Sequence, residues 1–136
     1  MPATTHSPKP YDGPSREEVL AMRREFLAPS LLTYYRDPVM IVEGSMQWLF
    51  DETGRRYLDF FGGIVTVSVG HCHPRVVEKV REQVERLQHT TTIYLHPTIA
   101  EFGRKLASTM PANSGLEVCY FTSSGSEANE LAMLMS

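Results

Sequence analysis

The sequence feature that most constrains the fold is the stretch VCYFTSSGSEANELAMLMS, residues 118–136. An apolar run, Val118–Phe121, precedes a turn of serine and glycine, and a run that is apolar nearly all round follows. A strand that is apolar on both faces is typical of the interior of a parallel sheet covered by helices. A helix that is apolar on every side is typical of the middle of a larger protein. We therefore predict an α/β fold with a parallel sheet.

The turn SSGS, residues 123–126, lies between the predicted strand and the predicted helix, which is an arrangement that cradles phosphates. A helix N-terminus offers unpaired N–H groups, Gly125 lets an anion approach the backbone, and the serine hydroxyls can donate. Ser124 and Glu127 also match a capping box, which many helices have without any ligand. Glu127 would repel a phosphate unless its carboxylate turned back toward the helix start. The residues alone leave both interpretations open.

Helices and a small meander are predicted upstream of this turn. Ser15 and Glu18 form a capping-box pattern, and Pro29 ends the helix that it starts. Asp51-Glu52-Thr53-Gly54 separates two strand-like runs, which predicts an antiparallel meander over residues 39–60. A loop with some extended character and two amphipathic helices follow: residues 62–74, then 74–88 and 96–110.

We divide the chain into a flexible tail (1–14), an N-terminal segment with helix and meander (15–70) and the truncated start of a large domain (71–136). The tail has four prolines, no arginine and no long apolar stretch, so we predict neither a signal nor a transit peptide. We expect the cytoplasm or the mitochondrial matrix. A net charge of −3 and short apolar runs predict no nucleic-acid partner and no membrane span.

The amino-acid sequences of several segments resemble those of a known family. SSGSEANE resembles the phosphate-binding turn of class III pyridoxal-phosphate-dependent aminotransferases. YLDFFGGIVTVSVGHCHPRV and the earlier YYRDPVMIVEG and WLFDETGRRYLD resemble further segments of that family. SSGSEANELAMLM together with GGIVTVSVGHCHP is most similar to the class III alanine–glyoxylate aminotransferases. The resemblance runs from about Phe26 to the end of the chain.

The resemblance implies a fold-type I transferase with pyridoxal 5'-phosphate as its cofactor. It implies that Gly125 and Ser126 bind the cofactor phosphate through backbone N–H groups, with Ser124 beside them. It places Tyr34 and Ile64 in the substrate pocket, for which plain packing is the alternative. It further implies amino acid and oxo acid substrates, with alanine as the amino donor and glyoxylate as the acceptor, and a homodimer or homotetramer.

No catalytic residue is predicted within the chain. Pyridoxal-phosphate chemistry needs a lysine amine that can lose its proton, and the three lysines lie in the tail or on polar helix faces: Lys9, Lys79 and Lys105. The resemblance puts the required lysine after Ser136. We therefore expect an N-terminal piece of an aminotransferase, inactive by itself. The alternative is a non-catalytic truncated product that binds a phosphate-bearing ligand or a full-length partner.

The run His71-Cys72-His73 is the one pattern that suggests a metal. Two histidines on one side of an extended segment can bind zinc, but no fourth ligand lies at a recognised spacing. We therefore predict no metal site, and the resemblance makes this loop structural, near the entrance of the active site.

Overall fold

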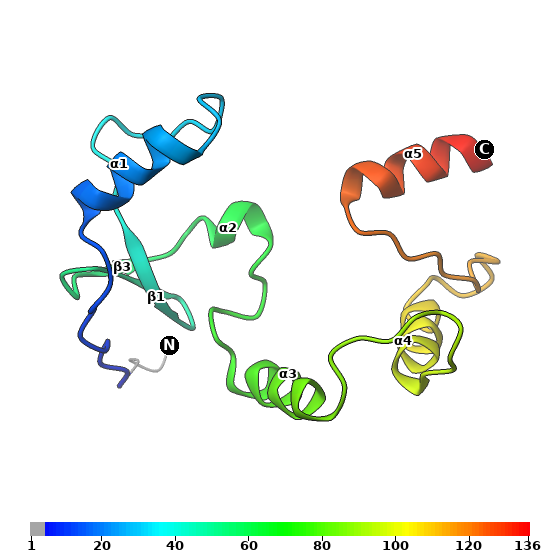
Figure 1. Cartoon of the computed structure of the whole chain (residues 1–136). Coiled ribbons are helices and arrows are strands. Elements are labelled where there is room, and N and C mark those ends of the chain that lie inside the picture. Colours follow the sequence, from blue (N-terminus) through cyan, green and yellow to red (C-terminus); the bar gives the residue numbers. More distant parts are fainter. Residues whose placement is uncertain (1–4) are drawn as a thin grey trace. The chain divides into compact units, whose positions relative to one another are not determined.

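The computed structural model describes residues 5–136, and Figure 1 shows the course of the chain through its helices and strands. The elements are α1 (Arg16–Phe26), β1 (Ile41–Ser45), β2 (Trp48–Asp51), β3 (Arg56–Leu58), α2 (Gly62–Val65), α3 (Pro74–Arg86), α4 (Pro97–Ala107) and α5 (Gly125–Met135). Their contacts divide the chain into two units, Met1–Arg86 and Leu87–Ser136. None of the helices within residues 5–136 is long and apolar enough to cross a membrane.

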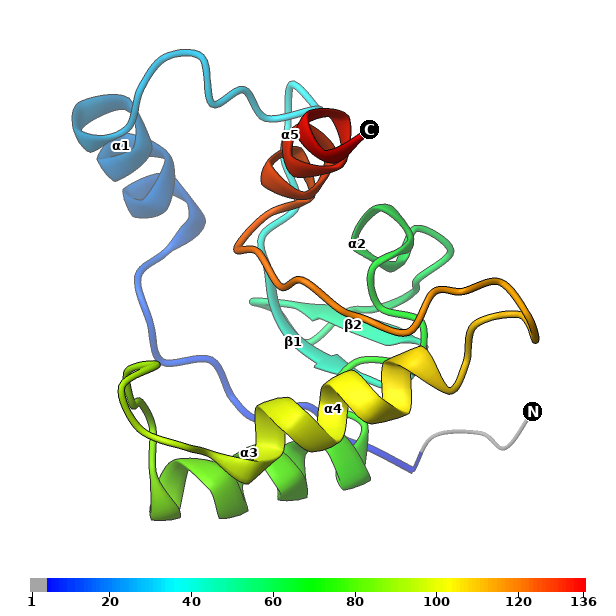
Figure 2. The same ribbon diagram turned by 90° about the vertical axis from the view of Figure 1, so that its right-hand side faces the viewer.

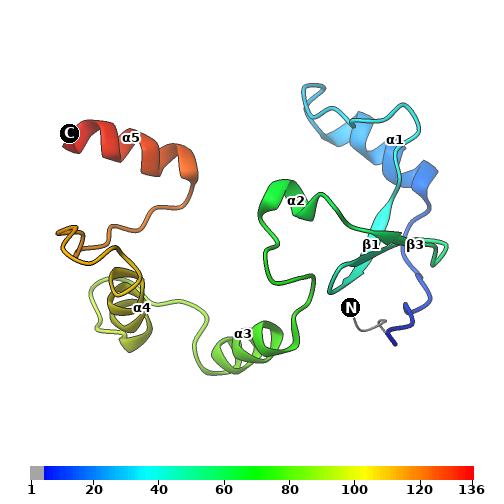
Figure 3. The same ribbon diagram turned by 180° about the vertical axis from the view of Figure 1, so that it is seen from behind.

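Helix α1 begins with the predicted capping box. The Ser15 hydroxyl accepts the Glu18 N–H at 3.2 Å, and the Glu18 carboxylate accepts the Ser15 N–H at 2.7 Å. This second bond lowers the pKa of Glu18. From α1 a long loop leads into β1 (Figure 3), and an ion pair between Arg16 and Asp37, 2.8 Å long, ties the helix to that loop.

The predicted meander is confirmed as a three-stranded antiparallel sheet in the order β1-β2-β3. Its β2–β3 turn is organised by Asp51, whose side chain is almost fully buried. One carboxylate oxygen accepts the Thr53 N–H at 3.0 Å and the Arg55 N–H at 2.9 Å, and the other accepts the Tyr57 hydroxyl at 2.7 Å. These bonds replace the water that the carboxylate loses on burial.

The meander packs around Phe50, which is only 2% exposed. Part of its cover comes from the N-terminal tail, because the His6 ring lies 5.5 Å from the Phe50 ring. Glu43 of β1 contacts the same tail through an ion pair with His6 and a 2.9 Å bond from the Lys9 N–H, and the latter is the main reason that its pKa is lowered. The flexibility of residues 1–14 stays a prediction, and its first four residues lie outside the described part.

Helices α3 and α4 are confirmed, with Pro74 and Pro97 in their first turns. Pro suits this position because its missing N–H would have no partner there. The His96 ring caps α4 by accepting the Thr98 N–H at 3.3 Å. The apolar stripe of α3, which includes Val80 and Val84, is about half exposed.

The strand predicted around Val118–Phe121 is not formed. The segment instead runs irregularly alongside α4, drawn in orange in Figure 2, with the Phe121 and Phe102 rings stacked 5.3 Å apart. The Cys119 thiol contacts the Gly103 carbonyl oxygen at 3.5 Å. The physical reason is that a strand requires ladder hydrogen bonds to a neighbour, and no segment of residues 5–136 pairs with this one.

Candidate functional site

The predicted turn lies at the start of α5, with Ser124 as the N-cap residue. The Ser124 hydroxyl accepts the Glu127 N–H at 3.2 Å, so the predicted cap is present. The Glu127 carboxylate turns back and accepts the Ser123 N–H at 2.9 Å, one residue before the cap. The carboxylate is therefore engaged by the backbone of the turn.

The cap leaves two backbone donors of the first turn without an acceptor. The N–H groups of Gly125 and Ser126 make no hydrogen bond to any described residue, and neither does the Ser126 hydroxyl. Gly125 has no positive φ, and a Cβ built there would meet no described atom within 4 Å. Neither backbone strain nor crowding within the chain therefore requires glycine. Capping and anion binding use different N–H groups and are compatible here.

The two predicted substrate residues belong to the unit Met1–Arg86, whereas the turn belongs to Leu87–Ser136. Tyr34 is 95% exposed, and its ring meets that of Tyr35 edge-on at 5.4 Å. Ile64 is 73% exposed. Neither side chain is packed in a core of the described residues, and their contact with a substrate stays a prediction.

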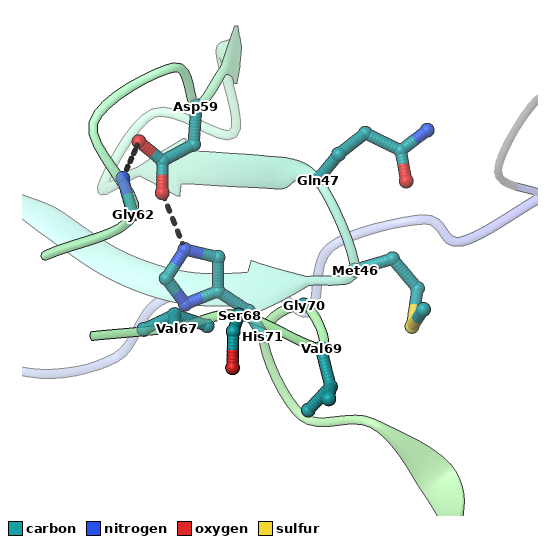
Figure 4. A pocket seen from close by; sticks show the side chains of 9 residues that line it. All are labelled: Met46, Gln47, Asp59, Gly62, Val67, Ser68, Val69, Gly70 and His71. Carbon is teal, nitrogen blue, oxygen red and sulfur yellow. Dashed lines mark hydrogen bonds and ion pairs between the residues drawn. The ribbon is translucent and has the colours of Figure 1, made fainter. Parts of the chain in front are cut away.

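Asp59 and His71 form a bonded pair that the sequence interpretation missed. One Asp59 carboxylate oxygen accepts the N–H groups of Phe61 and Gly62 at 2.8 and 2.9 Å, and the other lies 2.7 Å from His71 Nε2 (Figure 4). The His71 bond, followed by the two backbone bonds, holds the pKa of Asp59 below its ordinary value. The signal in the sequence is an aspartate three residues before a Gly-Gly pair, which suits a side chain that bonds nearby backbone N–H groups.

A pocket of about 280 Å³ opens beside this pair (Figure 4). Its lining combines the β1–β2 turn with the segment after β3: Met46, Gln47, Asp59, Gly62, Val67, Ser68, Val69, Gly70 and His71. Since His71 is bonded to Asp59, the His71-Cys72-His73 run does not gather around a metal position. Over the described ranges, no group of three His, Cys, Asp or Glu side chains is arranged to hold a metal ion.

Comparison with known proteins supplies a family. The family profile described as aminotransferase class-III matches residues 33–136. Alanine–glyoxylate aminotransferase 2 homolog 2, mitochondrial, of Arabidopsis thaliana is 54% identical over 136 residues, which are 100% of this chain and 28% of that protein. Alanine–glyoxylate aminotransferase 2, mitochondrial, of Homo sapiens is 47% identical over the same 136 residues, 26% of its length. The chain thus spans about a quarter of these relatives.

A solved structure shows the same relationship. The structure of a phospholyase from Arthrobacter in complex with phosphoethanolamine matches with a TM-score of 0.75 and 34% sequence identity. The match covers 86% of this chain and 26% of the phospholyase. The fold of the present chain is therefore shared with enzymes whose chains are several times longer.

Proposed function

Because this chain belongs to the class III aminotransferases, we propose that it is the part of a pyridoxal-phosphate-dependent aminotransferase that binds the cofactor phosphate. The observation that supports this proposal lies at the start of α5. The N–H groups of Gly125 and Ser126 have no acceptor among the described residues, and no described atom lies within 4 Å of the position that a Gly125 Cβ would take. Two adjacent donors at the positive end of a helix dipole fit a phosphate group. The residues present therefore fit the cofactor that the family implies.

Each residue of the turn has a distinct part in this proposal. Gly125 and Ser126 donate their N–H groups to the phosphate, and the Ser126 hydroxyl donates a further hydrogen bond. Ser124 fixes the helix start through its bond to the Glu127 N–H, so the donors are oriented before the ligand arrives. When bound, pyridoxal phosphate would supply the electron sink that transamination needs.

We further propose alanine as the amino donor and glyoxylate as the acceptor, because relatives that match the whole chain carry those substrates in their names. Tyr34 and Ile64 contact the substrate, in keeping with their exposed side chains. The same relatives are named mitochondrial, which supports the mitochondrial matrix as the compartment. The working enzyme is a homodimer or homotetramer.

The test uses the full-length enzyme that carries this sequence. With alanine and glyoxylate it should form pyruvate and glycine in equal amounts, which a coupled assay for pyruvate and chromatography for glycine measure. Phosphoethanolamine, the ligand in the Arthrobacter structure, is the comparison substrate. Phosphate release from phosphoethanolamine without transamination of alanine would contradict the substrate proposal. Cofactor binding without turnover of any amino acid would favour the non-catalytic alternative.

A further inference from the structure

The segment α2 is one turn of left-handed helix. Its four residues have positive φ angles: +54° at Gly62, +59° at Gly63, +60° at Ile64 and +65° at Val65. Hydrogen bonds from Val65 N–H to the Phe61 oxygen, 3.0 Å, and from Thr66 N–H to the Gly62 oxygen, 2.9 Å, close it. Gly62 and Gly63 accept this backbone readily, whereas the β-branched Ile64 and Val65 do not. Such a strained conformation persists only where the surrounding structure enforces it.

The two ends of the segment 59–71 provide that enforcement. The backbones of His71 and Met46 exchange two hydrogen bonds of 2.7 Å, which add the segment's last residue to the meander. The His71 side chain lies against Gly44 of β1, where a Cβ would come within 2.9 Å of His71 Cβ. Glycine is therefore needed for this approach, which fixes the ring on the strand.

Asp59 then links this anchored ring to the start of the left-handed turn. One of its oxygens bonds to His71 Nε2, and the other accepts the N–H groups of Phe61 and Gly62, where the turn begins. The Asp59 side chain is only 6% exposed, so these bonds compete little with water. The Asp59 carboxylate is ionised at neutral pH, which makes all three bonds charge-assisted, and these bonds in turn lower its pKa.

We propose that Asp59 and His71 are positioning residues, which hold the left-handed turn so that Ile64 is presented to the substrate. This inference rests on the proposed function, in which Ile64 contacts the substrate. The Ile64 side chain is exposed, so no burial of that side chain offsets the cost of the strained backbone. The strain is instead consistent with a conformation that is fixed for contact with a ligand.

The first measurement is of the turn itself, in the full-length enzyme with cofactor bound. His71→Phe keeps a ring but removes the donor, whereas the amide of His71→Gln can still donate to Asp59. Hydrogen exchange at the Val65 and Thr66 amides should be about 10-fold faster in His71→Phe and close to the parent rate in His71→Gln. Ser68→Ala is the control, because Ser68 lies in the same segment and bonds to no described residue.

The second measurement separates KM from kcat. His71→Phe should raise the KM for alanine about 10-fold while kcat and cofactor affinity stay within twofold, because only a substrate contact has moved. Ile64→Ala should also raise KM, and adding His71→Phe to it should change little more, since both act through one contact.

Different failures have different meanings. If Ile64→Ala raises KM but His71→Phe leaves both exchange and KM unchanged, the positioning role is wrong and the proposed substrate contact stands. If His71→Phe speeds exchange while neither variant changes KM, the inference and the role of Ile64 are both wrong. Equal losses of kcat and cofactor affinity in His71→Phe would indicate a general structural role and would also overturn the inference.

Discussion

Substitutions at three successive residues, Ser124, Gly125 and Ser126, should separate helix capping from phosphate binding. Ser124→Ala removes the acceptor of the Glu127 N–H, a 3.2 Å bond, and should lower the free energy of unfolding by about 1 kcal/mol. Ser126→Ala removes a hydroxyl that bonds to no described residue, so the unliganded protein should lose no stability. Gly125→Ala adds a methyl group that meets no described atom within 4 Å, and it should stabilise the helix by up to about 1 kcal/mol.

The variants that cost the apoenzyme no stability should be the ones that weaken cofactor binding most. A hydrogen bond to a charged group contributes about 1.5–3 kcal/mol, so Ser126→Ala should weaken binding roughly 10- to 150-fold if the hydroxyl contacts the phosphate. Gly125→Ala should weaken it as well, because the new methyl occupies the space through which the phosphate approaches the backbone. Ser124→Ala should have the smallest effect, since the N–H groups of Gly125 and Ser126 remain.

The assay needs two numbers for each variant of the full-length enzyme. Cofactor dissociation is measured by titrating the apoenzyme and following the absorbance of pyridoxal phosphate. The melting temperature of the same apoenzyme reports stability. If Ser124→Ala lowers the melting temperature while Ser126→Ala and Gly125→Ala bind cofactor as tightly as the parent, the turn is only a helix cap and the proposed site is wrong.

Three further predictions concern the 136-residue chain itself. Borohydride reduction with pyridoxal phosphate should label none of its lysines stoichiometrically, in part because the bond to Glu82 raises the pKa of Lys79. One fully labelled lysine in a peptide map would contradict this. The chain should self-associate as its concentration rises, because the apolar side chains of α3 and α5 are exposed; a monodisperse monomer with a sharp melt would be the contrary result. The chain should lose stability in acid. Because the pKa of Asp59 is lower in the folded than in the unfolded state, its stabilisation is fully present above about pH 4 and is lost as the pH falls through the folded-state pKa. In a urea series over pH, Asp59→Asn should flatten that decline, and an unchanged profile would refute the assignment.

Elements specified by neighbouring residues could be predicted from the sequence. The caps at Ser15 and Ser124 each depend on a partner three residues along, and the hairpin depends on Asp51 and the residues that directly follow it. The turn at Gly125 was recognisable for the same reason. The sequence pattern does not decide whether helix capping and phosphate binding can occur together, because this depends on which N–H group each of them uses.

The parts that escaped prediction depend on residues far apart in the chain. Nothing local favours a left-handed backbone at Ile64 except the preceding Gly-Gly pair, because its enforcement comes from Asp59 bonding to His71, twelve residues later. The strand expected around Val118–Phe121 fails to form for a related reason. Its apolar composition describes where a strand could lie, whereas the ladder bonds that define one must come from another segment.

The cover that His6 gives to Phe50 has a consequence for the order of folding. The hairpins of the meander close locally and form within microseconds, whereas bringing His6 to Glu43 closes a loop of 37 residues at a larger entropic cost. His6 is thus among the last residues of its unit to dock. A substitution at His6 should therefore leave the hairpins to form at their usual rate and slow only the final step that seals Phe50 from water.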